Sequence, residues 1–184
     1  SYRGIRFGFD GLDSDAYKVF LFWPLSVPFT LGLTYPYVTK RQREFFVGDS
    51  RYGRSLFGLE LPTGRVYKLY ILAGVAMLAW FALVGATFMS AIAQLTTAED
   101  SDVVPGLSVF AGIGLLYLGV GAVVVFVRTS FENMVWNHTL LDQHRFESRL
   151  RAGRMLWLYA SNIVLLVLTL GLFVPWARVR MAQY

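Results

Sequence analysis

Four long stretches of this 184-residue chain contain no charged side chain, and they organise the whole sequence: 19–39, 69–98, 103–127 and 155–177. A helix needs roughly 20 apolar residues to cross a hydrocarbon core of about 30 Å, and each stretch is longer than that. The pattern predicts an all-α integral membrane protein with minor β elements. We expect residues 1–184 to form a single membrane domain, because the segments between the stretches are too short for a separate large one.

The composition agrees with a membrane protein and narrows the chemistry. Hydrophobic residues make up 55% of the chain, and the formal net charge is +5. In a membrane protein, basic residues gather in cytoplasmic loops and beside anionic headgroups. No recognised nucleic-acid motif accompanies the charge, so nucleic acid is not an expected partner. Cysteine is absent, which removes disulfides, thiolate nucleophiles and Cys-ligated metals from consideration.

The connections between the apolar stretches differ in charge. The connection 40–68 carries seven basic residues and 128–154 carries five, whereas 99–102 carries acidic residues and no basic one. Positive residues are retained on the cytoplasmic side of the membrane. We therefore expect 40–68 and 128–154 to be cytoplasmic and 99–102 to be periplasmic. Segments 69–98 and 103–127 then form a spanning helical hairpin.

The predicted spanning hairpin carries small residues at helical spacing. They are Ala82, Ala86 and Ser90 in one segment, and Ser108, Gly112 and Gly119 in the other. Such spacing lets two helix backbones approach closely in lipid. A glycine-lined pore would need more polar side chains on the same face, so helix packing is the favoured interpretation.

Segments 19–39 and 155–177 differ from the hairpin because basic residues flank both of their ends. The run Thr-Leu-Gly-Leu occurs in both, at 30–33 and 169–172, shortly before a proline. Glycine followed closely by proline predicts the end of one helix and the start of another. The first segment also contains residues that we expect to break its helix: Pro24, Pro28 and Pro36.

An internal repeat aligns residues 6–45 with residues 145–184 without a gap, and a fainter third copy starts near residue 56. Each copy begins with a pattern typical of a short strand that enters an apolar segment. We expect strands near 3–9, 55–61 and 143–150, paired into a small cytoplasmic sheet. Tyr52-Gly53 is the expected turn between two of them.

The repeat leaves two topologies open. If all four apolar segments span the membrane, 19–39 and 155–177 run in opposite directions and form an inverted pair. If these two segments are instead re-entrant, or lie shallow, all of their basic flanks stay in the cytoplasm. The near-identical flanks favour the re-entrant topology.

The resemblance to a known family rests on IRFGFDG near the start, TLGLTYPY and KRQREFF in the first copy, and TLLDQHRF with TLGLFVPWARVRMAQY in the second. On these strings the chain resembles the YjgN-like family, a domain family of unknown function. The resemblance covers nearly the whole chain. It implies a multi-pass protein of the bacterial inner membrane with repeated units, and no established activity. Some relatives are encoded beside a membrane metallopeptidase, which implies such an enzyme as a partner.

Two departures from the family pattern matter. The first copy has Tyr37-Val38 where the family usually has Trp-Ala. The second copy stops at Tyr184, before its expected strand. The second departure favours a truncated form of a longer protein.

The sequence offers little catalytic chemistry. His138 and His144 lie near acidic residues, but none of the helical metal signatures such as HExxH is present. No serine sits in a nucleophile elbow, and no glycine-rich phosphate loop follows a predicted strand. None of the four apolar segments contains Asp or His. We therefore expect no enzyme activity, no catalytic or metal-binding residues and no cofactor.

Two sets of residues are candidate sites. Ser161 and Asn162 are a polar pair inside the last apolar segment, where a possible intramembrane site competes with an ordinary interhelical hydrogen bond. Basic residues just past a proline in each copy are candidates for binding anionic lipid: Lys40, Arg41, Arg43, Arg178 and Arg180.

These observations predict a non-enzymatic inner-membrane protein, acting as a subunit or scaffold of a larger membrane assembly. It would present a basic, cytoplasmic, lipid-facing surface. The expected partners are membrane lipids and either other membrane subunits or further copies of the chain. The alternative is a channel or transporter built on inverted repeats, with Asn162 near its pathway.

Overall fold

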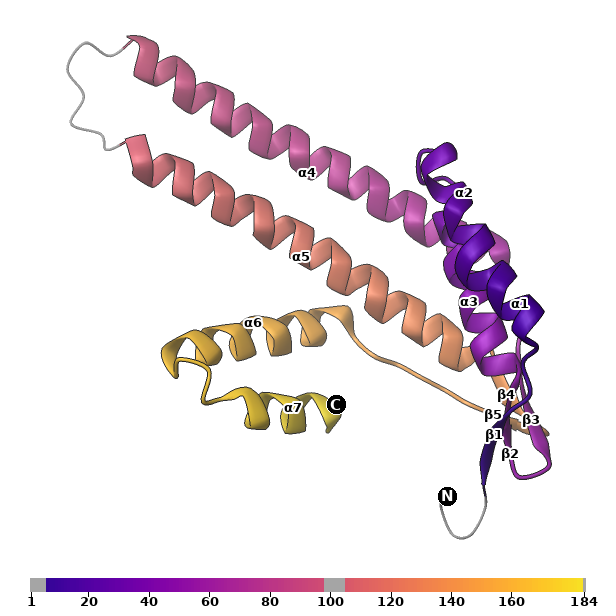
Figure 1. Ribbon diagram of the computed structural model, residues 1–184. Helices are drawn as coiled ribbons and strands as arrows, with labels where there is room; N and C mark the ends of the chain where they lie inside the picture. The colour runs from indigo at the N-terminus through magenta and orange to yellow at the C-terminus, as the bar shows by residue number, and fades with distance from the viewer. Residues whose placement is uncertain (1–5, 98–104, 184) are drawn as a thin grey trace. The chain divides into compact units, whose positions relative to one another are not determined.

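The computed structural model describes residues 6–97 and 105–183, and these form a mostly helical protein with a small antiparallel sheet (Figure 1). Two of the helices are long and apolar, as the hydropathy pattern predicted. The chain divides into two compact units, one of residues 1–72 with 130–149 and one of residues 73–129 with 150–184.

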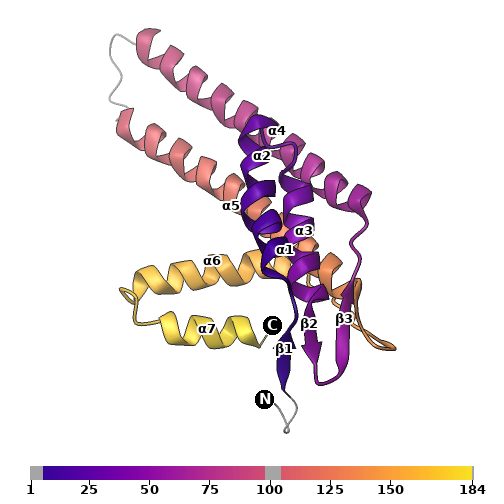
Figure 2. The ribbon, with the colours of Figure 1, turned by 45° about the vertical axis from the view of Figure 1, so that its right-hand side comes forward.

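The first unit contains the sheet, whose five strands follow the order β1-β2-β3-β4-β5. Figure 2 shows the first three of them, β1, β2 and β3, side by side. The strands are β1 (Phe7–Phe9), β2 (Ser50–Tyr52), β3 (Ser55–Leu59), β4 (Thr139–Leu141) and β5 (His144–Arg145). Each pair of neighbours is antiparallel, with Phe7 opposite Tyr52 and Leu59 opposite Thr139. A turn is present at the expected place, where Gly53 adopts a left-handed φ of 64°. It joins β3 to β2, a strand that was not expected, and not two of the three expected strands.

The strand expected at 143–150 is much shorter in the structure, where β5 ends at Arg145. The reason is a competing side chain. The Ser148 N–H donates to Asn137 Oδ1 at 2.6 Å, and Asn137 Nδ2 donates to the Ser148 carbonyl at 3.1 Å. Asparagine side chains that bond to backbone in this way offer the chain an alternative to a sheet ladder.

The helical part of the first unit begins with three consecutive elements: α1 (Asp13–Tyr17), a π-helical turn η1 (Lys18–Phe22) and α2 (Trp23–Phe29). The expectation that Pro24 and Pro28 break this helix is wrong, because helical conformation continues from residue 13 to residue 29. The π-helical turn Lys18–Phe22 lies directly before Trp23-Pro24, and π-bulges are one of the features at which helices kink without ending. Gln42 Nε2 donates to the Val19 carbonyl within this turn at 3.5 Å.

Helix α3 (Tyr35–Gly48) returns antiparallel to that segment after a tight turn. In the turn, Leu31 and Gly32 are both left-handed, with φ of 51° and 86°. The Gly32 N–H donates to the Val27 carbonyl at 2.9 Å and the Leu31 N–H to the Pro28 carbonyl at 3.3 Å. These two bonds define a Schellman cap, in which a leucine occupies the left-handed position that is usually glycine.

The second unit repeats this arrangement with α6 (Ala152–Leu168) and α7 (Val174–Ala182). Leu170 and Gly171 have φ of 49° and 92°. The Gly171 N–H donates to the Leu166 carbonyl at 2.8 Å, and the Leu170 N–H to the Val167 carbonyl at 3.2 Å. The Thr-Leu-Gly-Leu runs therefore form the same turn twice, and each turn ends one helix and starts another, as glycine and proline predicted.

The long helices are α4 (Thr63–Thr97) and α5 (Pro105–Asn137), which run antiparallel (Figure 1). A Cβ added to Gly112 would lie 2.2 Å from the Phe88 ring, and one added to Gly119 would lie 2.0 Å from the Trp80 indole. The glycines thus allow close packing, although each receives an aromatic ring and not another small residue. The acidic residues predicted to face the periplasm, 99–102, lie outside the described residues.

Few apolar side chains of the described residues are buried. The core of the first unit consists of Val38, Leu59, Leu61, Val66, Leu69, Phe131 and Val135. Within the long helices, the segments Thr63–Ser90 and Phe110–Asn137 are long and apolar enough to cross a membrane, by length and composition. Only 17% and 6% of their most apolar windows are buried inside the protein. Most of their hydrophobic surface is therefore exposed.

Candidate functional site

The basic residues of the first copy lie on α3, and Lys40 is held inside the first unit. Its ammonium donates to Thr63 Oγ1 at 2.6 Å and lies 3.5 Å from Glu44. Glu44 also accepts the Leu61 N–H at 3.0 Å. Both charged side chains are largely buried. This arrangement ties α3 to the start of α4, which is a structural task for Lys40 in addition to any lipid contact.

Arg41 is half-exposed and stacks beside Tyr37, with its guanidinium carbon 5.3 Å from the ring centroid. Arg41 Nε donates to the Tyr37 hydroxyl at 2.9 Å, and this hydrogen bond raises the pKa of Arg41 against the opposing effect of desolvation. Glu44 lies 3.7 Å away. The guanidinium therefore stays charged and keeps one side open to an anion.

Arg43 also has a carboxylate partner, since its guanidinium donates to Glu132 on α5. All three predicted lipid-binding cations of the first copy thus face an acidic side chain. Two carboxylates, Glu44 and Glu132, balance most of the charge of the three cations. Sequence inspection missed this compensation, because Glu132 lies far from Arg43 along the chain.

A cavity of about 420 Å³ opens beside this cluster, between the first helical segment and α3. Its lining carries charges of both signs together with aromatic rings: Asp15, Lys18, Val19, Trp23, Arg41, Glu44, Phe45 and Asp49. Lys18 is paired with Asp15 at 2.9 Å. The mixed lining makes this a polar surface recess in which no single charge dominates.

In the second copy, the structure brings together residues from both predicted sites. Arg180 Nη1 donates to Ser161 Oγ at 3.0 Å and to Asn162 Oδ1 at 3.3 Å. Ser161 Oγ itself donates to the Trp157 carbonyl at 2.7 Å. The interhelical hydrogen bond expected as the ordinary explanation for Asn162 is therefore present between α6 and α7. Arg178, in contrast, projects from α7 as an exposed side chain.

This cluster has more donors than acceptors. Asn162 is only 4% exposed, and its Nδ2 has no hydrogen-bond partner among the described residues. Arg180 forms no ion pair within the part of the chain that the structure describes. A buried amide without a partner is destabilising by roughly 1–3 kcal/mol. The cluster is suited to an acceptor oxygen.

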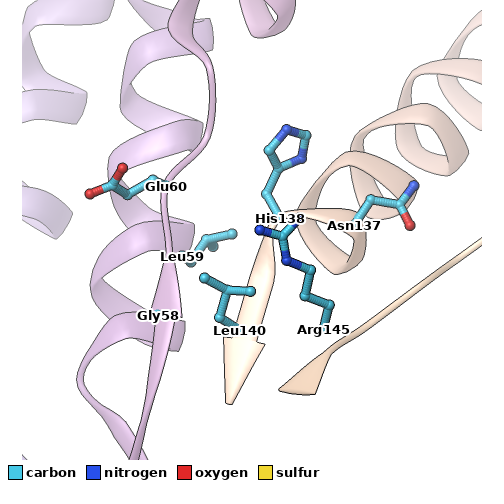
Figure 3. A pocket seen from close by; sticks show the side chains of 7 residues that line it. All are labelled: Gly58, Leu59, Glu60, Asn137, His138, Leu140 and Arg145. Carbon is cyan, nitrogen blue, oxygen red and sulfur yellow. The ribbon is translucent and has the colours of Figure 1, made fainter. Parts of the chain in front are cut away.

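A further pocket of about 310 Å³ lies at the sheet and was not expected from the sequence (Figure 3). It is lined by Gly58, Leu59, Glu60, Asn137, His138, Leu140 and Arg145. His138 Nδ1 donates to the Met134 carbonyl at 2.8 Å, which leaves Nε2 as the acceptor of the neutral ring. Figure 3 shows the Glu60 carboxylate turned away from that ring. The pairing of β3 with β4 forms this pocket, so no local sequence motif signals it.

The described residues contain no group of three or more His, Cys, Asp or Glu side chains able to hold a metal ion. No curated protein and no solved structure is significantly similar to the chain. One family model matches, that of the bacterial protein of unknown function (DUF898), and it covers residues 1–184. The match confirms the resemblance to a YjgN-like domain family, and the chain belongs to this bacterial family of unknown function.

Proposed function

We propose that this chain is a non-enzymatic, multi-pass protein of the bacterial inner membrane that serves as a subunit or scaffold of a larger membrane assembly. The observation that carries the proposal is the exposure of the long apolar helices. A core helix of a soluble protein buries most of its apolar surface, whereas the apolar windows of α4 and α5 are only 17% and 6% buried. Lipid and neighbouring subunits are the surroundings that would cover such helices.

The short helices support the re-entrant topology. Helix α6 has 17 residues, which measure about 25 Å, less than the roughly 30 Å of the hydrocarbon core. Each turn reverses the chain direction, so that Arg180 of α7 bonds to Ser161 and Asn162 in the middle of α6. Gln42 of α3 reaches Val19 in the same way. Such hairpins keep both of their basic ends on one side of the membrane, which we assign to the cytoplasm.

The basic cytoplasmic surface would hold anionic headgroups through the partly exposed guanidiniums. Arg41, Arg43 and Arg178 are the cations best exposed for this purpose. A basic residue near an anionic surface contributes about 1 kcal/mol. Lys40 contributes less because it is buried beside Glu44. Protein partners would be other membrane subunits, further copies of the chain, or the membrane metallopeptidase implied by the family resemblance.

The test begins with single cysteines at Ser14, Ser50, Ser101, Thr139 and Gln183, introduced into a chain that has no cysteine of its own. Intact cells are labelled with an impermeant reagent. Labelling at residue 101 alone is the expected result. Labelling at residues 14 and 183 as well would replace the re-entrant topology by four spans. A protein extracted from the membrane by alkaline carbonate would overturn the membrane assignment itself.

The assembly part of the proposal needs a second measurement. The chain is purified from native membranes in a mild detergent, and its complexes are weighed by native mass spectrometry. A partner or a second copy at fixed stoichiometry is the expected result. A monodisperse monomer across several detergents would contradict the scaffold function.

The buried amide of Asn162 favours one alternative, a channel or transporter with the Ser161–Asn162–Arg180 cluster near its pathway. Polar groups inside a membrane often mark a substrate path. Flux into liposomes that is abolished by Asn162→Ala would support this alternative. Unchanged flux in that variant would remove Asn162 from the pathway.

A further inference from the structure

The two most exposed large apolar side chains of the helical hairpins, Leu31 and Leu170, lie in the two Thr-Leu-Gly-Leu turns. Leu31 is 93% exposed and Leu33 is 75% exposed in the first copy. Leu170 is 95% exposed and Leu172 is 85% exposed in the second. Polar residues usually occupy such turns in water. Two turns with the same backbone conformation therefore carry the same apolar tip.

The backbone N–H groups of each tip need no solvent. The six N–H groups of residues 30–35 all donate within the turn, five of them to carbonyl oxygens and that of Thr34 to Thr30 Oγ1. Residues 169–174 repeat the pattern, with the Phe173 N–H donating to Thr169 Oγ1 at 3.1 Å. The two threonine hydroxyls donate in turn to the carbonyls of Ser26 and Leu165. Hydrocarbon requires this kind of internal satisfaction, because it offers no hydrogen-bond partner.

The conformation of Leu31 and Leu170 adds a second argument. Both occupy the left-handed position of the cap, where glycine would be free of strain. In water an exposed leucine there would have two free-energy costs, one from its left-handed backbone and one from the exposure of its apolar side chain. Transfer of the leucine side chain into an apolar medium would offset the backbone strain.

We infer that each turn is the tip of a wedge that inserts into one leaflet of the bilayer, with lipid acyl chains as its binding partner. The inference rests on the membrane location proposed above and extends it to a function, the bending of the membrane. Basic residues at the base of each hairpin, such as Arg41 and Arg178, hold the headgroup layer while the tips spread the chains beneath. Two wedges in the cytoplasmic leaflet expand that leaflet relative to the other.

The shape of the tips favours lipid over a protein pocket. Each tip is convex, and a Cβ added to Gly32 or Gly171 would meet nothing within 4 Å. A protein partner would have to offer a separate concave site to each of two such tips. Fluid acyl chains surround a convex apolar tip without a matching surface, and the neighbouring cations match anionic headgroups in charge.

Depth measurement on the full chain in lipid bilayers tests the insertion. Single cysteines at residues 31 and 170 are spin-labelled, and their accessibility to oxygen is compared with that to a water-soluble nickel chelate. We expect the ratio of oxygen to nickel accessibility to rise several-fold over labels at residues 14 and 143, which are exposed and lie outside the long apolar helices. A ratio equal to these aqueous references would overturn the wedge. Low accessibility to both reagents would overturn it too, because a protein partner would then cover the tip.

A label at residue 78 of α4 separates this inference from the proposed function. Leu78 is an exposed residue of a predicted span. A high oxygen ratio at residue 78 with a low ratio at the tips would overturn the wedge and leave the membrane protein intact. A low ratio at both would count against the membrane location itself.

The bending itself is tested with a variant in which all four tip leucines are serine: Leu31→Ser, Leu33→Ser, Leu170→Ser and Leu172→Ser. The matched control carries Leu12→Ser and Leu56→Ser, two exposed leucines outside the tips. Reconstituted at equal protein density, the native chain and the control should give smaller vesicles by electron cryomicroscopy than the tip variant. Equal diameters for all three proteins would overturn the bending function.

Discussion

Helices α2 and α3 of the first unit and helices α6 and α7 of the second form two hairpins that agree at the turn and differ at the base. At the turn, Leu31 and Leu170 have nearly equal φ, and so do Gly32 and Gly171. The helices that lead into the turns also agree, since the repeat alignment pairs residues 13–29 with 152–168, the bounds of the observed helical segments.

The difference at the base is electrostatic. Arg41 of the first hairpin has Glu44 nearby, whereas the aligned Arg180 is followed at the same spacing by the neutral Gln183. Arg180 bonds instead to Asn162, which is buried. The first hairpin thus neutralises its cations through carboxylates, and the second surrounds its guanidinium with neutral groups.

The helix before the turn differs as well. The position aligned with Asn162 is Trp23, which packs edge-to-face on Tyr37 with ring centroids 5.1 Å apart. The first hairpin replaces a polar contact by an aromatic one. The tip is the same in both copies, whereas the base differs. The two parts of each hairpin are therefore under different structural constraints. The common tip indicates one role shared by both hairpins, and the different bases indicate a separate role for each hairpin.

The substitution with the largest expected effect on stability removes the carboxylate at the base of the first hairpin. Replacing Glu44 by alanine leaves Lys40 buried without its carboxylate and leaves the Leu61 N–H without its acceptor. We expect a loss of about 3 kcal/mol in the free energy of unfolding, measured by denaturant titration in mixed micelles. The control is Glu147→Ala, because Glu147 pairs with Arg149 at the surface, and a change below about 1 kcal/mol is expected there. Equal effects for the two variants would mean that Glu44 does not hold the base together.

The next effect probes the common turn. Gly32→Ala and Gly171→Ala place a side chain at left-handed φ in open space, so only the backbone opposes the change. Each should lower the free energy of unfolding by about 1–2 kcal/mol, and by the same amount in both copies. Gly153→Ala is the matched control, since Gly153 lies in α6 with open space and no left-handed φ, and it should be neutral or stabilising. Clearly unequal losses at Gly32 and Gly171 would show that the surroundings of the two turns differ.

The sequence made these turns predictable because their chemistry is local. A glycine and a following proline are sufficient to end one helix and begin another, and the structure has both turns at the Thr-Leu-Gly-Leu runs. The contact between Arg180 and Asn162 also had a signal. Once the chain reverses at 169–173, residues equally far from the turn on either side face each other.

Other features depend on contacts that no local pattern encodes. Strands β2 and β4 have three residues each, too few for alternation to be recognised, and they exist through pairing with their neighbours. Pro24 was expected to break a helix, but helical conformation continues through it after a π-helical turn. The compensation of Arg43 by Glu132 depends on the fold alone.

A substitution with a smaller effect, and one of opposite sign on the free energy of unfolding, makes the base of the second hairpin apolar at the position where the first has Trp23. Asn162→Leu removes the buried amide that lacks a partner, at the cost of one long hydrogen bond from Arg180. We expect the free energy of unfolding to rise by about 1 kcal/mol. Ser161→Ala serves as control and should change it little, because the hydroxyl bonds mainly to its own helix. Destabilisation by Asn162→Leu would instead indicate that the amide has a partner in the membrane.

The smallest effect sharpens the electrostatic difference directly. Gln183→Glu gives the exposed end of α7 the carboxylate that Glu44 supplies on α3, three residues after the guanidinium. A helical pair at this spacing adds about 0.2–0.5 kcal/mol, and 1 M salt should remove the gain because the new carboxylate is exposed. Thermal unfolding at low and high salt measures it, with Gln183→Ala as the control that should show no salt dependence. Salt weakens attraction between exposed charges and leaves packing unaffected. A gain that persists in 1 M salt would therefore mean that the two bases differ in packing and not in charge.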